Sequence, residues 1–143
     1  EQRGARWHHQ ILEKRQVKPP AAIASRLSLA KNLRGLHLRS LHFADSQPFV
    51  YEDRWINPLA VPGFDLEEIE DSSANEWLVQ HAPFSWGEFT VSAANANKEQ
   101  AELLETAEGT AIVIIDRTTF NNEQAITCVR LAYAPGYRMH TTL

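Results

Sequence analysis

Hydrophobic side chains recur with two different periods along this chain, and each period predicts a different element. A period of two residues is typical of a strand with one buried face, and a period of three to four residues is typical of a helix. The shorter period predicts six strands, at residues 7–17, 35–43, 48–56, 87–94, 111–120 and 125–133. The longer period predicts four short helices, at residues 21–30, 64–69, 76–79 and 98–105.

One predicted strand, 35–43, changes the phase of its hydrophobic positions halfway along. Even-numbered positions up to Leu38 are hydrophobic, and odd-numbered positions from Leu41 onward are hydrophobic. We interpret the change at Arg39 and Ser40 as a β-bulge. Because bulges redirect side chains and are common next to functional sites, this strand is a candidate for carrying a binding site.

The order of predicted elements repeats after 77 residues. Segments 21–55 and 98–132 each contain a helix, a polar break, a strand, a turn and a second strand. Five aligned positions are identical, at Ala24, Leu27, Ala30, Phe43 and Gln47 of the first copy. Two copies are too few for a solenoid. We therefore expect one pseudo-symmetric sheet with helices packed against it, and a ligand site at the seam between its halves.

Length and composition limit the class of protein. The 143 residues fit a single domain, 1–143, that can bury a core without disulfides or metals. Fourteen Lys and Arg against 18 Asp and Glu give a net charge of −4, with no basic cluster, so this chain by itself is a poor binder of nucleic acid. The single cysteine, Cys128, excludes an intrachain disulfide and indicates a reducing, cytoplasmic compartment. We find no stretch long and apolar enough to predict a membrane helix.

Motifs of the common catalytic and cofactor-binding classes are missing from the sequence. It contains no phosphate loop, no Gly-x-Ser-x-Gly and no His-Glu-x-x-His. His8 and His9 lie next to each other on a predicted strand, so they point to opposite faces and cannot bind a metal as a pair. We expect no metal and no cofactor. Because the chain begins at Glu1 without a leader signature, and Met139 is its only methionine, we also expect it to be a fragment of a longer protein.

Polar side chains are concentrated on the hairpin formed by 35–43 and 48–56. His37, Arg39 and His42 lie on its first strand, and Glu52, Asp53 and Arg54 lie on its second. An Arg can hold a carboxylate with two hydrogen bonds, and a Glu can accept from ring N–H groups. The hairpin could therefore bind opposite ends of a small polar molecule. The alternative is that these charges form the solvated face of the sheet.

Three further groups of residues are candidates for the same site. The second copy of the repeat has Asp116, Arg117 and Arg130 at related positions. Ser72, Ser73 and Asn75 precede a predicted helix and form a candidate anion site, or serve only as its capping residues. Tyr133 and Tyr137 could cover a pocket, or belong to the core.

The stretch LHFADSQPFVYEDRWINP at 41–58, followed by VPGF at 61–64, resembles the effector-binding (UTRA) domain of GntR-type bacterial transcription repressors. Within that family it is most similar to the histidine-utilisation branch. The resemblance spans nearly the whole chain, and its specific part is the stretch from Pro48 to Asn57. The short winged-helix DNA-binding domain that precedes this region in the family is missing from the sequence, which agrees with the expectation of a fragment.

The resemblance implies an α+β, chorismate-lyase-like fold with a mostly antiparallel sheet of about six strands and flanking helices. It implies a cytoplasmic homodimer that binds a metabolite and thereby controls DNA binding by the missing domain. In the histidine-utilisation branch that metabolite is urocanate, an imidazole joined to an acrylate. The ligand-binding residues expected from the resemblance and the polar pattern together are Arg39, His42, Glu52, Ser72, Ser73, Asn75, Arg130, Tyr133 and Tyr137.

Two other functions stay open from the sequence. Enzyme relatives of the same fold cleave pyruvate from chorismate, and such a lyase would also need Arg and Glu in a closed pocket. A dimerisation module that binds no ligand is the third hypothesis. The sensor hypothesis requires Arg39 and Glu52 to line one cavity.

Overall fold

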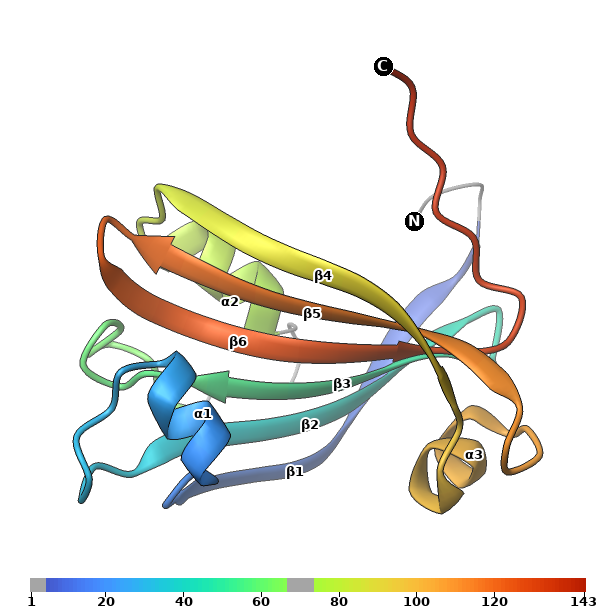
Figure 1. The fold of residues 1–143 in the computed structure, drawn as a ribbon, viewed down its shortest axis with the longest axis horizontal. Coiled ribbons are helices and arrows are strands. Elements are labelled where there is room, and N and C mark those ends of the chain that lie inside the picture. The colour runs from blue at the N-terminus through green and yellow to red at the C-terminus, as the bar shows by residue number, and fades with distance from the viewer. Residues whose placement is uncertain (1–4, 67–73) are drawn as a thin grey trace.

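The structure is a computed structural model that describes residues 5–66 and 74–143, and its main feature is one antiparallel sheet (Figure 1). The sheet has six strands in the order β1-β2-β3-β6-β5-β4, and every neighbouring pair is antiparallel. This confirms the predicted α+β class and the six predicted strands. Their bounds are β1 Trp7–Val17, β2 Gly35–Ala44, β3 Gln47–Ile56, β4 Trp86–Asn95, β5 Ala111–Asn121 and β6 Gln124–Tyr133.

In the described residues, three short helices cover the two faces of the sheet. Helices α1 (Ala21–Arg26) and α3 (Lys98–Leu104) lie on one face, and α2 (Ala74–His81) lies on the other (Figure 1). Helix α1 is shorter than predicted because Leu27 caps it and Ser28 has a left-handed backbone with φ 54°. The helix predicted at 64–69 falls largely outside the described residues.

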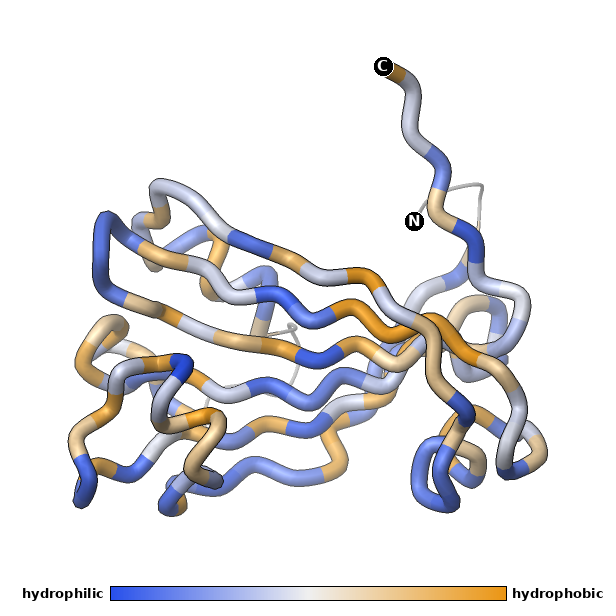
Figure 2. The backbone as a smooth tube through the Cα atoms, viewed as in Figure 1, coloured by the Kyte–Doolittle hydropathy of each residue, from blue (hydrophilic) through white to orange (hydrophobic). Residues whose placement is uncertain are grey.

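Both faces of the sheet carry a hydrophobic core. On the α2 face, Leu36, Leu38 and Ile56 pack with Leu78 of α2. On the α1/α3 face, side chains of β2, β3, β5 and β6 pack with α3, and a second cluster packs around Leu27, just after α1. Hydrophobic and hydrophilic positions are both found along the strands (Figure 2), and β2 and β3 contribute buried hydrophobic side chains to both layers.

The bulge predicted at Arg39 and Ser40 is wrong, because β2 pairs with β3 without interruption through these two residues. The register shift lies in the neighbouring strand, where Leu12 of β1 is the extra residue opposite Arg39 and Ser40. A second shift lies near the turn, where Phe49 of β3 is extra. The hydrophobic positions of β2 change phase because both faces of the strand are covered. The hydrophobic side chains in its first half face α2, and those in its second half face α3.

The halves of the sheet are related as the 77-residue repeat predicts. Strands β1, β2 and β3 run inward from one edge, and β4, β5 and β6 run inward from the other. They meet where β3 pairs with β6, and Asp53 pairs there with Arg130, its own counterpart 77 residues later. A pseudo-two-fold axis therefore passes between these two residues. Helix α2 has no counterpart, so it is the element that makes the two faces different.

Candidate functional site

A buried ion pair lies near the middle of the α2 face. Glu52 and Arg54 are two residues apart on β3, so both side chains point to the same side of the sheet. Arg54 Nε donates to Glu52 Oε2 at 2.7 Å, and the two residues are only 1% and 4% exposed. Charged side chains are almost never buried this deeply unless they are paired, so the pair marks a specialised part of the core.

Neighbouring strands supply further partners to this pair. His42 Nε2 of β2 lies 3.0 Å from Glu52 Oε1. Arg54 Nη1 donates to the Thr127 hydroxyl of β6 at 3.2 Å, and that hydroxyl donates to the Trp55 carbonyl at 2.8 Å. The network therefore joins β2, β3 and β6 across the seam between the halves.

One nitrogen of Arg54 remains without a partner. Its Nη2 is buried and finds no acceptor among the residues that the structure describes. Buried donors in native proteins are nearly always satisfied, and an exception calls for a functional explanation. Nη2 is therefore a candidate hydrogen-bond donor to an acceptor that lies outside the described residues.

The charges around Glu52 keep its carboxylate ionised. Burial alone raises the pKa of Glu52, but the positive charge of Arg54 and the hydrogen bonds from His42 and Arg54 outweigh burial and lower the pKa to about 2. Glu52 is thus an anion at any physiological pH.

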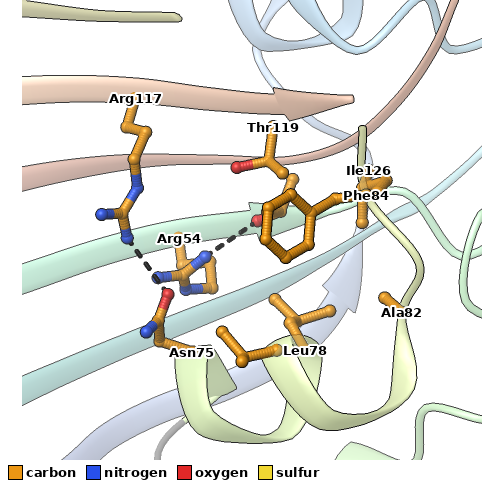
Figure 3. Close-up of a pocket in the computed structure, with 10 residues that line it drawn as sticks. Arg54, Asn75, Leu78, Ala82, Phe84, Arg117, Thr119 and Ile126 are labelled. Carbon is orange, nitrogen blue, oxygen red and sulfur yellow. Dashed lines mark hydrogen bonds between the residues drawn. The ribbon is translucent and has the colours of Figure 1, made fainter. Parts of the chain in front are cut away.

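A cavity of about 220 Å³ lies between α2 and the sheet (Figure 3). Arg54 and Arg117 line its polar side together with Asn75 of α2, whose Oδ1 accepts from Arg117 Nη2 at 3.1 Å. Leu78 and Phe84 are among the side chains that line its apolar side. The cavity combines an apolar wall with a few convergent polar groups, which is typical of a small-molecule site.

The polar wall of this cavity carries more positive than negative charge. Burial lowers the pKa of Arg117, and the positive charge of Arg54 lowers it further. Glu52 neutralises one of the two guanidinium groups, which leaves the other without a carboxylate partner among the described side chains. An anionic ligand would relieve this repulsion.

The structure brings several predicted site residues to this face. His42 and Glu52 belong to the buried network, and Asn75 lines the cavity. Tyr133 and Tyr137 lie on the same face and stack on each other with ring centroids 3.7 Å apart, but they are not among the residues that line the cavity. Ser72 and Ser73 lie outside the described residues.

Arg39 and Arg130 lie on the opposite face, so the expectation that Arg39 and Glu52 line one cavity is wrong. The sensor site that required these two residues together is therefore wrong as well, and a sensor site on the α2 face has to use Arg54 and Arg117 instead. Arg39 pairs with Asp53 in the β2–β3 ladder, and adjacent residues of a strand alternate between faces. Its guanidinium donates to Tyr51 at 2.7 Å and to Glu99 of α3 at 3.0 Å. Arg130 is bound to Asp116 by two hydrogen bonds on the same face.

The expected ligand-binding residues omitted Arg54 and Arg117, and the sequence carries a signal only for Arg54. Strand alternation from Glu52 places Arg54 on its side, and the ladder places Arg117 of β5 on the same face. His9 is a further residue of this face. Its ring lies 5.6 Å from that of His42, and its buried Nε2 has no partner among the described residues. His8 stacks on Phe43 instead, which confirms that the two histidines point to opposite faces.

Residues 5–66 and 74–143 contain neither a group of metal ligands nor a membrane-spanning helix. No group of three His, Cys, Asp or Glu side chains in these ranges is arranged to hold a metal ion. None of the described helices has the length and hydrophobicity needed to cross a membrane.

Comparison with known proteins explains this combination of sheet and cavity. The family model of the UTRA domain matches residues 2–140. The chain belongs to the UTRA family. Among curated proteins, this UTRA chain is 28% identical over 136 residues to the histidine utilization repressor of Pseudomonas putida and 29% identical over 138 residues to that of Pseudomonas aeruginosa. Each match covers 95% of the chain and 54% of the relative, so the chain spans about half the length of these relatives.

Solved structures share the fold of the UTRA chain. The C-terminal domain of the histidine utilization repressor from Pseudomonas syringae pv. tomato superimposes with a TM-score of 0.89 at 24% identity, covering 96% of this chain and 99% of that one. The ligand-binding domain of a candidate GntR-family transcriptional regulator from Bordetella bronchiseptica superimposes with a TM-score of 0.86 at 23% identity, covering 100% and 92%. These similarities confirm the predicted fold class.

Proposed function

We propose that this chain is the effector-sensing domain of a bacterial transcription repressor and that its cavity binds a small carboxylate. The observation that carries the proposal is Arg54, which lines the cavity and whose buried Nη2 has no acceptor among the described residues. A ligand carboxylate would accept from Arg54 and Arg117 together. Charge-assisted hydrogen bonds of this kind are stronger than neutral ones.

The effector that we propose is urocanate or a closely related imidazole acid. Two of the similar proteins are named as repressors of histidine utilisation, and urocanate is the metabolite that the family resemblance implies. A cavity of about 220 Å³ suits one compact metabolite, since drug-sized ligands occupy pockets of about 300–1,000 Å³. His42 and Glu52 do not line the cavity but hold Arg54 in place from the same face, so the imidazole end of the ligand would lie against the apolar wall that includes Leu78 and Phe84.

Repression would be controlled by a population shift in a homodimer of the longer protein. Urocanate would favour the conformation that holds the attached DNA-binding domains at the wrong spacing for their operator. The coupling free energy between an effector site and a DNA-binding site is typically about 1–3 kcal/mol. The proposal includes no catalysis, so incubation with chorismate should release no pyruvate.

Titration calorimetry with urocanate tests the proposal. Arg117→Met removes one cation from the cavity wall and leaves an unbranched apolar side chain, so we expect at least a tenfold loss of affinity for urocanate. Arg130→Met is the matched control, because Arg130 lies on the other face of the sheet, and we expect its affinity to equal that of the wild type.

Two analogues locate the groups that are recognised. Methyl urocanate lacks the carboxylate charge and should not bind, and cinnamate keeps the carboxylate and has an apolar ring that also fits the apolar wall, so it should still bind. Absence of both heat and thermal stabilisation with millimolar urocanate would remove the urocanate assignment. Equal effects of Arg117→Met and Arg130→Met would remove the cavity as the binding site.

A further inference from the structure

A second hollow, which we call the α1 groove, lies on the opposite face of the sheet from the cavity under α2. It has a volume of about 500 Å³ and is lined by residues of β1, β2 and β3 and by the segment that joins β1 to α1. Trp55 lines this groove and Arg54 lines the cavity, and as neighbours on β3 they point to opposite faces. The two hollows share no lining residue, so the α1 groove is a separate site.

A row of three residues crosses the strands along the α1 groove. Arg15 of β1 pairs with His37 of β2, and His37 pairs with Trp55 of β3, so the three side chains share one face of the sheet. The rings of His37 and Trp55 stack with their centroids 4.1 Å apart. Residues 18–20 line the groove as well and include two prolines, whose φ is fixed. The stacked rings and the prolines hold the groove in one shape.

His37 is the buried polar residue of the α1 groove. It is 8% exposed, and its Nε2 lies 2.7 Å from Asp53 Oδ1. A carboxylate only accepts hydrogen bonds, so Asp53 keeps a proton on Nε2. The other ring nitrogen, Nδ1, is buried and has no partner among the described residues. It can accept a hydrogen bond when the ring is neutral and donate one when the ring is charged.

Positive charge dominates the lining of the α1 groove. Arg15 and Lys18 line it, and the described residues that line it include no Asp or Glu. Arg15 Nη2 lies 3.3 Å from Glu13 Oε1, but the same oxygen lies 3.6 Å from Arg39 Nη1. One carboxylate is therefore shared by two guanidinium groups, which leaves the groove with a surplus of positive charge.

The sequence around the α1 groove has the same surplus. Residues 14–44 contain seven Lys or Arg, spread out instead of forming one run, and no Asp or Glu, whereas the rest of the chain has seven against 18. Helix α1 and the loops beside it belong to this segment and lie at one end of the sheet (Figure 1). Arg26, Lys31 and Arg34 of the segment are exposed. A cationic end on a chain of net charge −4 would attract anions toward the groove.

We propose that the α1 groove is a second ligand site and that it binds a phosphate monoester. Such a group carries a charge of about −1.5 to −2 at pH 7, which matches Arg15 and Lys18 better than the single charge of a carboxylate. His37 Nδ1 would donate to the phosphate dianion or accept from the hydroxyl of the monoanion, so its hydrogen bond is made in either protonation state. The volume of the groove leaves room for the organic part of the ester.

Titration calorimetry with phenyl phosphate at constant ionic strength tests this proposal. Removing both cations with Arg15→Gln and Lys18→Gln in one protein should raise the dissociation constant by about tenfold or more. The matched control combines Lys31→Gln and Arg34→Gln, which remove the same charge from exposed residues of the same segment that do not line the groove. We expect the control to change the dissociation constant by about twofold or less, because distant exposed charges are screened. Equal losses in the two double variants would overturn the proposal.

A single substitution in each hollow separates the two sites. His37→Phe keeps a ring beside Trp55 but removes both ring nitrogens, so it should weaken binding of phenyl phosphate, and circular dichroism checks that it folds. Arg117→Met lies in the cavity under α2 and should leave this affinity unchanged. Loss of phenyl phosphate binding in Arg117→Met, with normal binding in the Arg15 and Lys18 double variant, would overturn the assignment to the α1 groove.

Three further probes test the class of ligand. Inorganic phosphate should compete with phenyl phosphate, and benzoate, which has the same ring and one charge, should bind about tenfold more weakly. Benzoate that binds as tightly as phenyl phosphate, or no heat with millimolar phenyl phosphate, would overturn the proposal. So would binding of duplex DNA without binding of phenyl phosphate, because the surface would then recognise the phosphate diesters of a nucleic acid.

Discussion

At the scale of single residues, the Glu52–Arg54 pair is the feature that distinguishes this core from an ordinary one. A buried ion pair contributes little net stability, because the cost of desolvation offsets the attraction between the charges. Its removal is costly only when one partner is left behind. We therefore explain the pair by its position and not by its stability. Glu52 holds the guanidinium of Arg54 at the cavity, and Thr127 binds a second edge of the same group.

Replacing Glu52 by Gln should destabilise the protein strongly. The change leaves Arg54 buried without its carboxylate, and breaking a buried pair in this way typically costs about 3–5 kcal/mol. Urea unfolding followed by circular dichroism measures the difference in free energy. Asp53→Asn is the control, since Asp53 faces the other side of the sheet, is partly exposed and should cost about 1 kcal/mol or less. Equal losses in the two variants would contradict the role given to the pair.

The same carboxylate predicts how stability depends on acid. Glu52 has a pKa of about 2 in the folded protein against an ordinary value of 4.5. A lowered folded pKa stabilises the protein above the unfolded pKa, so this contribution is complete above about pH 4.5 and is lost as the pH falls toward 2. We expect wild-type unfolding free energy to fall across this range more steeply than that of Glu52→Gln. Parallel curves for the two proteins would assign the acid sensitivity to other groups.

At the scale of elements, the bulge predicted at Arg39 and Ser40 was the main error. It arose because both faces of β2 are covered by hydrophobic cores. Leu38 and Leu41 of β2 belong to different cores, so their spacing reflects two layers instead of a bulge. Helix α3 shows the reverse case, because the helix predicted at 98–105 from its hydrophobic period is found at Lys98–Leu104. Asn97 Oδ1 accepts from the backbone N–H of Gln100, and Gln100 Oε1 accepts from the backbone N–H of Asn97. These two hydrogen bonds form a capping box.

Removing that cap should weaken α3 measurably. Asn97→Ala deletes the acceptor for the Gln100 N–H, and loss of an N-cap typically costs about 1 kcal/mol. A lower midpoint of urea unfolding, with an unchanged dependence of the unfolding free energy on urea concentration, would show this loss of stability. Lys98→Ala, at the exposed next position, should change the midpoint little. If both variants behave like the wild type, α3 does not depend on its capping box.

At the scale of the whole molecule, the seam between β3 and β6 joins the two halves of the repeat. The cavity has residues from β3, β6 and β5 on one wall and α2 on the other, so it lies at the seam, and ligand binding there stays a prediction. Helix α2 belongs to neither copy of the repeat, so the cavity that it covers has no symmetry-related copy among the described residues.

The single cysteine reports on the integrity of this seam. Cys128 of β6 pairs with Trp55 of β3 and is buried, and burial raises the pKa of its thiol to about 11. Because the thiolate is the reactive form, a disulfide reagent at about pH 8 should label native protein only as fast as the chain opens. Labelling rates measured across a urea series should follow global unfolding. Rapid labelling in native buffer would show that the seam opens locally.

The sequence by itself determined the six strands, their pairing into two related halves and the family, because alternation, turn residues and the 41–58 motif are local features of the chain. It also determined that His42, Glu52 and Asn75 are candidates for one site. Only the tertiary structure decided which arginines face that site. A shift of one residue moves a side chain to the other face of a sheet, so Arg39 and Arg54 could be told apart only when the register of β1, β2 and β3 was known.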